Sequence, residues 1–124
     1  MTDDLVRKAE EAATRSYSPY SKYAVGAVLR TNDGREFAGV NVENAAFPLT
    51  QCAETTAIGM AAAAGYRPGD IAAIGVNASP CGACRQWIYE WRIPEVSFRR
   101  DDGTIAHYRA EELLPDTWNL PSTE

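Results

Sequence analysis

The sequence lacks any long apolar run, and no stretch approaches the roughly 20 apolar residues of a membrane-spanning helix. Positive charge is also scarce, because 12 basic against 17 acidic side chains give a formal net charge of −5. An acidic surface repels phosphate backbones, so we do not expect nucleic acid as a partner of this chain. Repeats, low-complexity segments and linkers are missing as well. We therefore expect one domain over residues 1–124.

Cysteine is rare, and its count of three is odd. An odd number argues against a framework of disulfides, and the acidic stretch Met1-Thr2-Asp3-Asp4 does not resemble a signal peptide. We expect a reducing, cytoplasmic setting without a membrane partner. In such a setting clustered cysteines bind metal or take part in chemistry more often than they form disulfides.

What the chain does contain is a regular succession of helical and extended patterns. A hairpin signal stands at residues 32–34 and a second turn signal at 101–103, Gly65 ends an alanine-rich helix, and Pro80 favours a helix start. We expect helices over residues 3–16, 52–64, 81–91 and 110–114, and strands over 23–30, 36–41, 71–76, 95–99 and 105–108. This order predicts an α/β fold, a three-layer α/β/α sandwich around a mixed five-stranded sheet. We expect its later strands to run parallel through helical crossovers.

All three cysteines lie in two short stretches, Thr50-Gln51-Cys52-Ala53-Glu54 and Ser79-Pro80-Cys81-Gly82-Ala83-Cys84. Each stretch opens a predicted helix, where unpaired N–H groups and the helix dipole favour the thiolate over the thiol. A structural zinc usually has four protein ligands, whereas a catalytic zinc has three and keeps one position for water. The only histidine, His107, lies in a late predicted strand. The cysteines therefore favour an open zinc site.

Other interpretations of these stretches exist. Cys81 and Cys84 alone are also compatible with a redox pair or with two buried thiols, but Pro80 and the third cysteine shift the balance toward metal. Glu54, in the first turn of its predicted helix, is typical of a partner of the helix dipole. Two residues after Cys52, it is also a candidate to carry protons for a water that the metal activates.

At these and other motifs the sequence resembles the small cytidine deaminases, along nearly the whole chain. The order and spacing of the motifs, more than any single one, make the resemblance specific. A zinc on three such ligands beside a non-ligating glutamate is the signature of zinc-dependent deaminases. The matching segments are Ser16-Tyr17-Ser18-Pro19-Tyr20-Ser21-Lys22-Tyr23, Val25-Gly26-Ala27, Gly39-Val40-Asn41-Val42-Glu43-Asn44, Cys52-Ala53-Glu54, Ser79-Pro80-Cys81-Gly82-Ala83-Cys84-Arg85-Gln86 and Glu112-Leu113-Leu114-Pro115.

The resemblance implies the fold of this family, a homotetramer with composite sites and a role in pyrimidine salvage. It implies that Cys52, Cys81 and Cys84 hold Zn²⁺ and that Glu54 carries the protons. The implied substrate contacts are Asn41 and Glu43 to a ribose hydroxyl, the Ala53 N–H to the pyrimidine carbonyl, Tyr23 against the base, and Trp118 in a neighbouring subunit's pocket. Simpler interpretations stay open: Asn41 and Glu43 as turn residues, Tyr23 as a strand core residue, and Trp118 as a cover for its own core.

Two features depart from the family pattern. Thr55 stands where the family commonly has arginine. Three thiolates around Zn²⁺ leave a net charge of −1, which a nearby cation would offset. Arg85 is kept and supplies part of that charge, but we expect Thr55 to lower the rate near neutral pH. The segment 75–78 is also shorter than the family's usual loop, which we expect to widen or re-aim the entrance to the site.

The sequence thus predicts a hydrolytic deaminase that converts cytidine, deoxycytidine or a related modified cytosine nucleoside to the uracil nucleoside and ammonia. One alternative is a deaminase of aminonucleoside antibiotics of the blasticidin S type. Those enzymes lack the glutamate that corresponds to Glu43, so its presence favours a ribose-binding site. Another alternative is a zinc-stabilised binding domain without catalysis, which requires a fourth protein ligand that the sequence does not convincingly supply.

Overall fold

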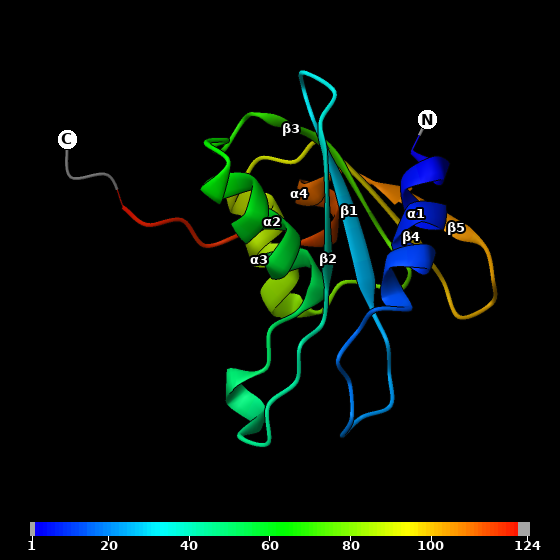
Figure 1. The fold of residues 1–124 in the computed structure, drawn as a ribbon. Coiled ribbons are helices and arrows are strands. Elements are labelled where there is room, and N and C mark those ends of the chain that lie inside the picture. Colours follow the sequence, from blue (N-terminus) through cyan, green and yellow to red (C-terminus); the bar gives the residue numbers. More distant parts are fainter. Residues whose placement is uncertain (1, 122–124) are drawn as a thin grey trace.

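The computed structural model describes residues 2–121, and its helices and strands follow the expected order (Figure 1). The helices are α1 (Asp3–Ala13), α2 (Ala53–Ala63), α3 (Gly82–Glu90) and α4 (Ala110–Leu113), and a single 3-10 turn, η1 (Phe47–Leu49), precedes α2. The strands are β1 (Gly26–Thr31), β2 (Glu36–Val40), β3 (Ile71–Val76), β4 (Glu95–Arg99) and β5 (Ile105–Tyr108). Among the helices between residues 2 and 121, none combines the length and apolar character that crossing a membrane requires.

The five strands form one mixed sheet of order β2-β1-β3-β4-β5. Strands β3 and β4 are parallel, and the other neighbouring pairs are antiparallel. Helix α1 packs on one face of the sheet, while α2 and α3 cover the other (Figure 1). The predicted three-layer α/β/α sandwich is therefore confirmed.

One expectation about the sheet is wrong. Parallel pairing through a helical crossover holds for β3 and β4, which α3 connects, but β5 runs antiparallel to β4. The connection between β4 and β5 is the tight turn at residues 101–103, in which Gly103 has a φ of +89°. A connection this short can only form a hairpin, because parallel strands need a crossover of a dozen or more residues.

The bounds of most elements match the expected ranges, with two differences near the N-terminus. Helix α1 ends at Ala13 instead of residue 16, because the chain turns there and Tyr17 forms a bridge with Val42. Strand β1 begins at Gly26 instead of residue 23. The three residues before Gly26 are not paired with a neighbouring strand. The side chain of Asn41 binds the backbone of Tyr23 and Val25 instead.

Small residues allow α2 to lie directly on the sheet. Ala53, Ala57 and Ala61 recur every four residues on the buried side of this helix. Opposite them lies Gly39 in β2, where a Cβ atom would come within 2.4 Å of the Ala53 carbonyl oxygen and 2.5 Å of the Ala57 nitrogen. Because Ala53 stands between the candidate residues Cys52 and Glu54, this contact sets where both lie above the sheet.

Replacing Gly39 with alanine should lower the free energy of unfolding by about 1–3 kcal/mol, since the new methyl group meets backbone atoms that cannot move aside cheaply. Urea denaturation measures this change. The matched control is Gly59→Ala within α2, where an added Cβ has no neighbour within 4 Å. That variant should gain about 0.5–1 kcal/mol, because alanine is the better helix former. Equal stability of the two variants would contradict the close contact.

Candidate metal centre

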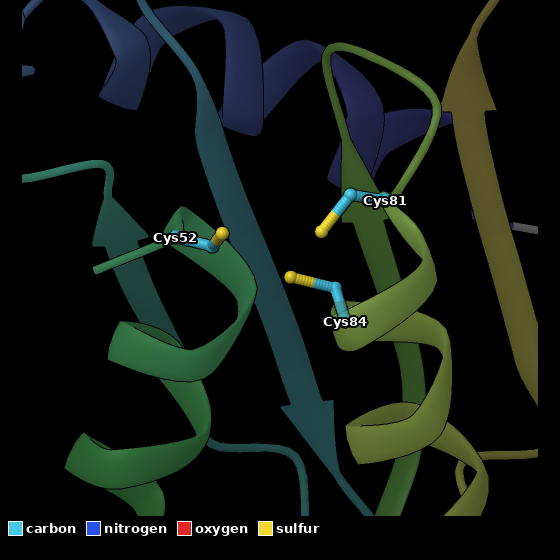
Figure 2. Close-up of side chains that lie close together, drawn as sticks. All are labelled: Cys52, Cys81 and Cys84. Atoms are coloured by element: carbon cyan, nitrogen blue, oxygen red, sulfur yellow. The ribbon is translucent and has the colours of Figure 1, made fainter. Parts of the chain in front are cut away.

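The three cysteine side chains converge at the start of two helices. Their sulfur atoms all lie within 4.8 Å of one another. Cys52 is the residue before α2, Cys81 is the residue before α3, and Cys84 lies in the first turn of α3. Figure 2 shows the three sulfurs pointing into the space between the two helices, in front of β1. The packing of α2 beside α3 thus brings Cys81 and Cys84 next to Cys52, although 28 residues separate Cys52 from Cys81.

The thiols do not ionise equally without a cation. Burial raises the pKa of Cys52, and burial together with the charge of Glu54 raises the pKa of Cys84. For Cys81, burial acts upward, but hydrogen bonds from the backbone N–H groups of Cys84 and Ala83 and with both other thiols leave the pKa lowered. A divalent cation among the sulfurs would favour three thiolates at once.

The donor set fits zinc. Thiolates are soft ligands, and sulfurs bound to tetrahedral zinc at about 2.3 Å lie roughly 3.8 Å apart. The observed separations, at most 4.8 Å, approach that value closely enough for small side-chain rotations to close the site. Within residues 2–121 no further His, Cys, Asp or Glu joins the cluster. The cluster therefore fits a zinc ion with three protein ligands and one open coordination position.

A cavity of about 190 Å³ opens beside the sulfurs. Glu54 is one of its lining residues although only 3% of this residue is exposed. Burial raises the pKa of the Glu54 carboxyl, and hydrogen bonds from its own backbone N–H and from the Cys84 thiol offset part of the rise. A carboxyl group that is buried, near the sulfurs and outside the cluster suits proton transfer better than metal ligation.

The predicted substrate-binding residues divide into two groups. Tyr23, Asn41 and Ala53 line the cavity, whereas Glu43 and Trp118 are not among the residues that do. The Glu43 carboxylate accepts hydrogen bonds from the backbone N–H groups of Tyr20 and Ser21 and from the Ser21 hydroxyl, which lower its pKa. Glu43 therefore holds the 17–23 loop next to the cavity.

Trp118 follows α4 and is 65% exposed, so it does not cover the core of its own chain. Within the part of the chain that the structure describes, this exposure excludes the simpler interpretation that the Trp118 ring covers the core of its own chain. The ring is instead available on the surface. Exposed tryptophan of this kind is typical of a contact with another molecule.

Neither Thr55 nor Arg85 reaches the sulfurs through a hydrogen bond. The Thr55 hydroxyl donates to the Cys52 carbonyl at 3.0 Å and brings no charge. The Arg85 guanidinium donates to the carbonyls of Pro80 and Leu113 and to the Ser79 hydroxyl. Arg85 thus ties the segment before Cys81 to the end of α4, a role that is structural as well as electrostatic.

The cavity contains residues that were not predicted as site residues. Four of these residues lie in the short segments that precede Cys52 and Cys81, and the fifth lies two residues after Tyr23. The alternation of an extended chain could have suggested that fifth residue, because positions i and i+2 share a face. These residues are Val25, Thr50, Gln51, Ala78 and Ser79.

Comparison with known proteins gives a consistent picture. A family model described as the cytidine and deoxycytidylate deaminase zinc-binding region matches residues 1–100. A cytidine deaminase of Halalkalibacterium halodurans is 40% identical over 119 residues, covering 90% of this chain and 89% of that one. A cytidine deaminase of Sporosarcina psychrophila is 41% identical over 124 residues, covering 94% and 90%. The crystal structure of cytidine deaminase from Burkholderia pseudomallei has a TM-score of 0.88 at 45% identity and covers 95% of this chain and 99% of that chain.

The zinc-free chain should take up one zinc ion per chain, with a rise in melting temperature, because metal binds the folded site and not the unfolded chain. All three cysteines of the sequence lie in the cluster, so zinc should also slow the reaction of every thiol with a disulfide reagent. Cys81→Ser should bind zinc more weakly and leave its two remaining thiols reactive. Thiol reactivity that zinc does not change would contradict the site.

Proposed function

The chain belongs to the zinc-binding family of cytidine and deoxycytidylate deaminases, and we propose that it hydrolyses cytidine and deoxycytidine to the uracil nucleosides and ammonia. The observation that carries this proposal is the single cavity lined by three sulfurs and a buried carboxyl. Tyr23, one of the residues that line this cavity, is exposed to solvent. A zinc-stabilised domain without catalysis would need a fourth protein ligand, and residues 2–121 bring none to the cluster.

The bound zinc, held by Cys52, Cys81 and Cys84, would supply the Lewis acidity that activates a water molecule for attack on C4 of cytosine. Glu54 takes one proton from the attacking water and gives it to the ring nitrogen N3. It then passes the second proton of that water to the amino group, which leaves as ammonia while C4 becomes a carbonyl. A buried carboxyl suits this work, because burial raises its pKa and so makes it a better proton acceptor than an exposed carboxylate.

Ala53 and Asn41 have donors left for the substrate. The Ala53 N–H belongs to the first residue of α2 and so has no acceptor within the helix, which makes it available to the pyrimidine carbonyl. The Asn41 amide uses one N–H for the Tyr23 carbonyl, and its oxygen accepts from Val25 N–H and the Ser16 hydroxyl. Its second N–H can therefore donate to a ribose hydroxyl, with Tyr23 against the base.

Glu43 takes a supporting place in this proposal. Its carboxylate is ionised, since its pKa is lowered, and it already accepts from Tyr20 and Ser21. One of its oxygens retains capacity for a further donor, because a carboxylate oxygen accepts more than one hydrogen bond. A ribose hydroxyl next to Asn41 would be such a donor.

Glu54→Gln should keep zinc but lower kcat by about 10²–10⁴-fold, because the amide cannot accept and return protons. Loss of ultraviolet absorbance of cytidine, with ammonia release, measures turnover. The matched control is Glu90→Gln at the exposed end of α3, which should retain wild-type activity. A Glu54→Gln variant with the kcat of the wild type would remove Glu54 from the mechanism. Ammonia release from blasticidin S but not from cytidine would overturn the proposed substrate.

We further propose a homotetramer in which Trp118 of one copy reaches the cavity of another. Exposed apolar rings support it: besides Trp118, the loops near the cavity expose Tyr17, Tyr20 and Phe47, and the last two pack edge to face at 6.1 Å. Apolar surface gathered in this way is typical of a protein interface. The tetramer should have a mass four times the 13.5 kDa of one chain by light scattering.

Mixing two variants tests the shared site. Trp118→Ala should raise KM for cytidine, because the neighbour's ring no longer closes the cavity. Glu54→Gln chains are inactive but keep Trp118, so mixed oligomers should lower KM again toward the wild-type value. If the KM of the mixed oligomers stays as high as that of Trp118→Ala alone, Trp118 does not contribute to the site of a neighbouring chain.

A further inference from the structure

Residues 23–26 form one wall of the cavity, and of these only Gly26, the first residue of β1, belongs to the sheet. Tyr23 and Val25 line the cavity, and they point to the same side because alternate residues of an extended chain share a face. The pairing of β1 with β2 ends at Gly26 opposite Val40, and its pairing with β3 ends at Ala27 opposite Val76. Something other than the sheet must therefore keep the wall extended.

On the β2 side, the side chain of Asn41 takes the place of a strand. Its amide nitrogen donates to the Tyr23 carbonyl at 2.9 Å, and its amide oxygen accepts from the Val25 N–H at 3.0 Å. Its backbone N–H also donates to the Val25 carbonyl. A side-chain amide carries the same donor and acceptor as a peptide group, so it can satisfy an extended segment in the same way.

On the β3 side, Asn77 does the same for the other two residues of the segment. Its amide nitrogen donates to the Ala24 carbonyl at 3.1 Å, and its amide oxygen accepts from the Gly26 N–H at 3.0 Å. Its backbone N–H donates to the Gly26 carbonyl at 3.3 Å. Residues 23–26 are thus held between two asparagine side chains, one on each edge.

The sequence marks this arrangement with a repeated triplet. Gly39-Val40-Asn41 ends β2 and Gly75-Val76-Asn77 ends β3. In each triplet the glycine lies against a helix: a Cβ on Gly39 would meet α2, and one on Gly75 would meet Leu5 of α1 at 2.6 Å. In each triplet the asparagine follows the last paired residue of its strand, and its side-chain amide binds the backbone of residues 23–26.

Asn77 also connects two walls of the cavity. Only Ala78, Ser79 and Pro80 separate it from Cys81, and two of these residues line the cavity. The same amide therefore joins the segment that carries Tyr23 and Val25 to the segment that leads to the metal ligand. Movement of one wall relative to the other would break both of its hydrogen bonds.

We propose that Asn77 is a positioning residue for substrate binding: its side-chain amide holds the Tyr23–Val25 wall at a constant distance from the segment before Cys81. Asn77 does not line the cavity, so it acts on the nucleoside through Tyr23 and Val25. The kinetic part of this inference rests on the proposed deaminase function. The structural part, the two hydrogen bonds to residues 24 and 26, does not.

Asn77→Ala should raise KM for cytidine about tenfold and leave kcat within about twofold, because a loosened wall weakens binding without moving the metal or Glu54. The inhibition constant of the product uridine should rise by the same factor, while the zinc content stays at one per chain. The matched control is Asn32→Ala. Asn32 makes a comparable side-chain bond, to the Gly69 carbonyl at 2.9 Å, beyond the opposite end of β1. Its loss should leave KM unchanged.

Hydrogen exchange separates the two asparagines. In the wild-type protein the amides of Val25 and Gly26 should exchange as slowly as those of β1. In Asn77→Ala the Gly26 amide should exchange faster, whereas Val25, bonded to Asn41, should stay slow.

A folded Asn77→Ala protein with wild-type KM and wild-type exchange at Gly26 would overturn the proposal, and so would an equal rise in KM in Asn32→Ala. If Asn77→Ala does not fold, hydrogen exchange of the wild-type protein decides. Fast exchange of the Gly26 amide would contradict its hydrogen bond to Asn77. If the wild-type chain releases no ammonia from cytidine, the proposed function fails, while the exchange experiment still tests Asn77.

Discussion

The structure depends on placing three thiols and a carboxyl close together in a partly buried site. Burial raises the pKa of Cys52, Cys84 and Glu54 and so favours their neutral forms, whereas hydrogen bonds lower the pKa of Cys81. A divalent cation bound to the sulfurs would change this balance by stabilising three thiolates, and the proposed proton carrier, Glu54, would lie next to them without being a ligand. The fold is therefore best understood as the means by which two helix starts, carrying these groups, are kept side by side.

Small residues provide that placement. Helix α2 rests on Gly39 through its alanines, and α1 rests on Gly26 and Gly75 on the opposite face of the sheet. Side chains at these glycines would push the helices outward by contacts with backbone, which is the least yielding kind of neighbour. The alanines of α2 thus do more than favour a helix. Their small side chains let the helix lie close to the sheet, and this sets where Cys52 and Glu54 lie above it.

The walls of the cavity are held by polar side chains that the sheet does not supply. Asn41 and Asn77 extend the pairing of β1 beyond the ends of β2 and β3, Glu43 holds the 17–23 loop, and Arg85 ties the segment before Cys81 to α4. Each of these bonds joins a side chain to a backbone group, as do most side-chain hydrogen bonds in proteins.

The amino-acid sequence by itself determined the order of the elements, the bounds of β3, β4 and β5, the three candidate ligands and the carboxyl beside them. These features depend on patterns over a few residues: turn signals, helix caps, period and the spacing of cysteines. Only the tertiary structure decided that the sulfurs of residues 52, 81 and 84 share one space, and that Glu43 binds the 17–23 loop and is not among the residues that line the cavity. The role of Asn77 belongs to this second group, because its partners are more than 50 residues away in the chain. Contacts of that kind exist only once helices and strands have packed, and no local pattern records which distant backbone group a side chain will meet.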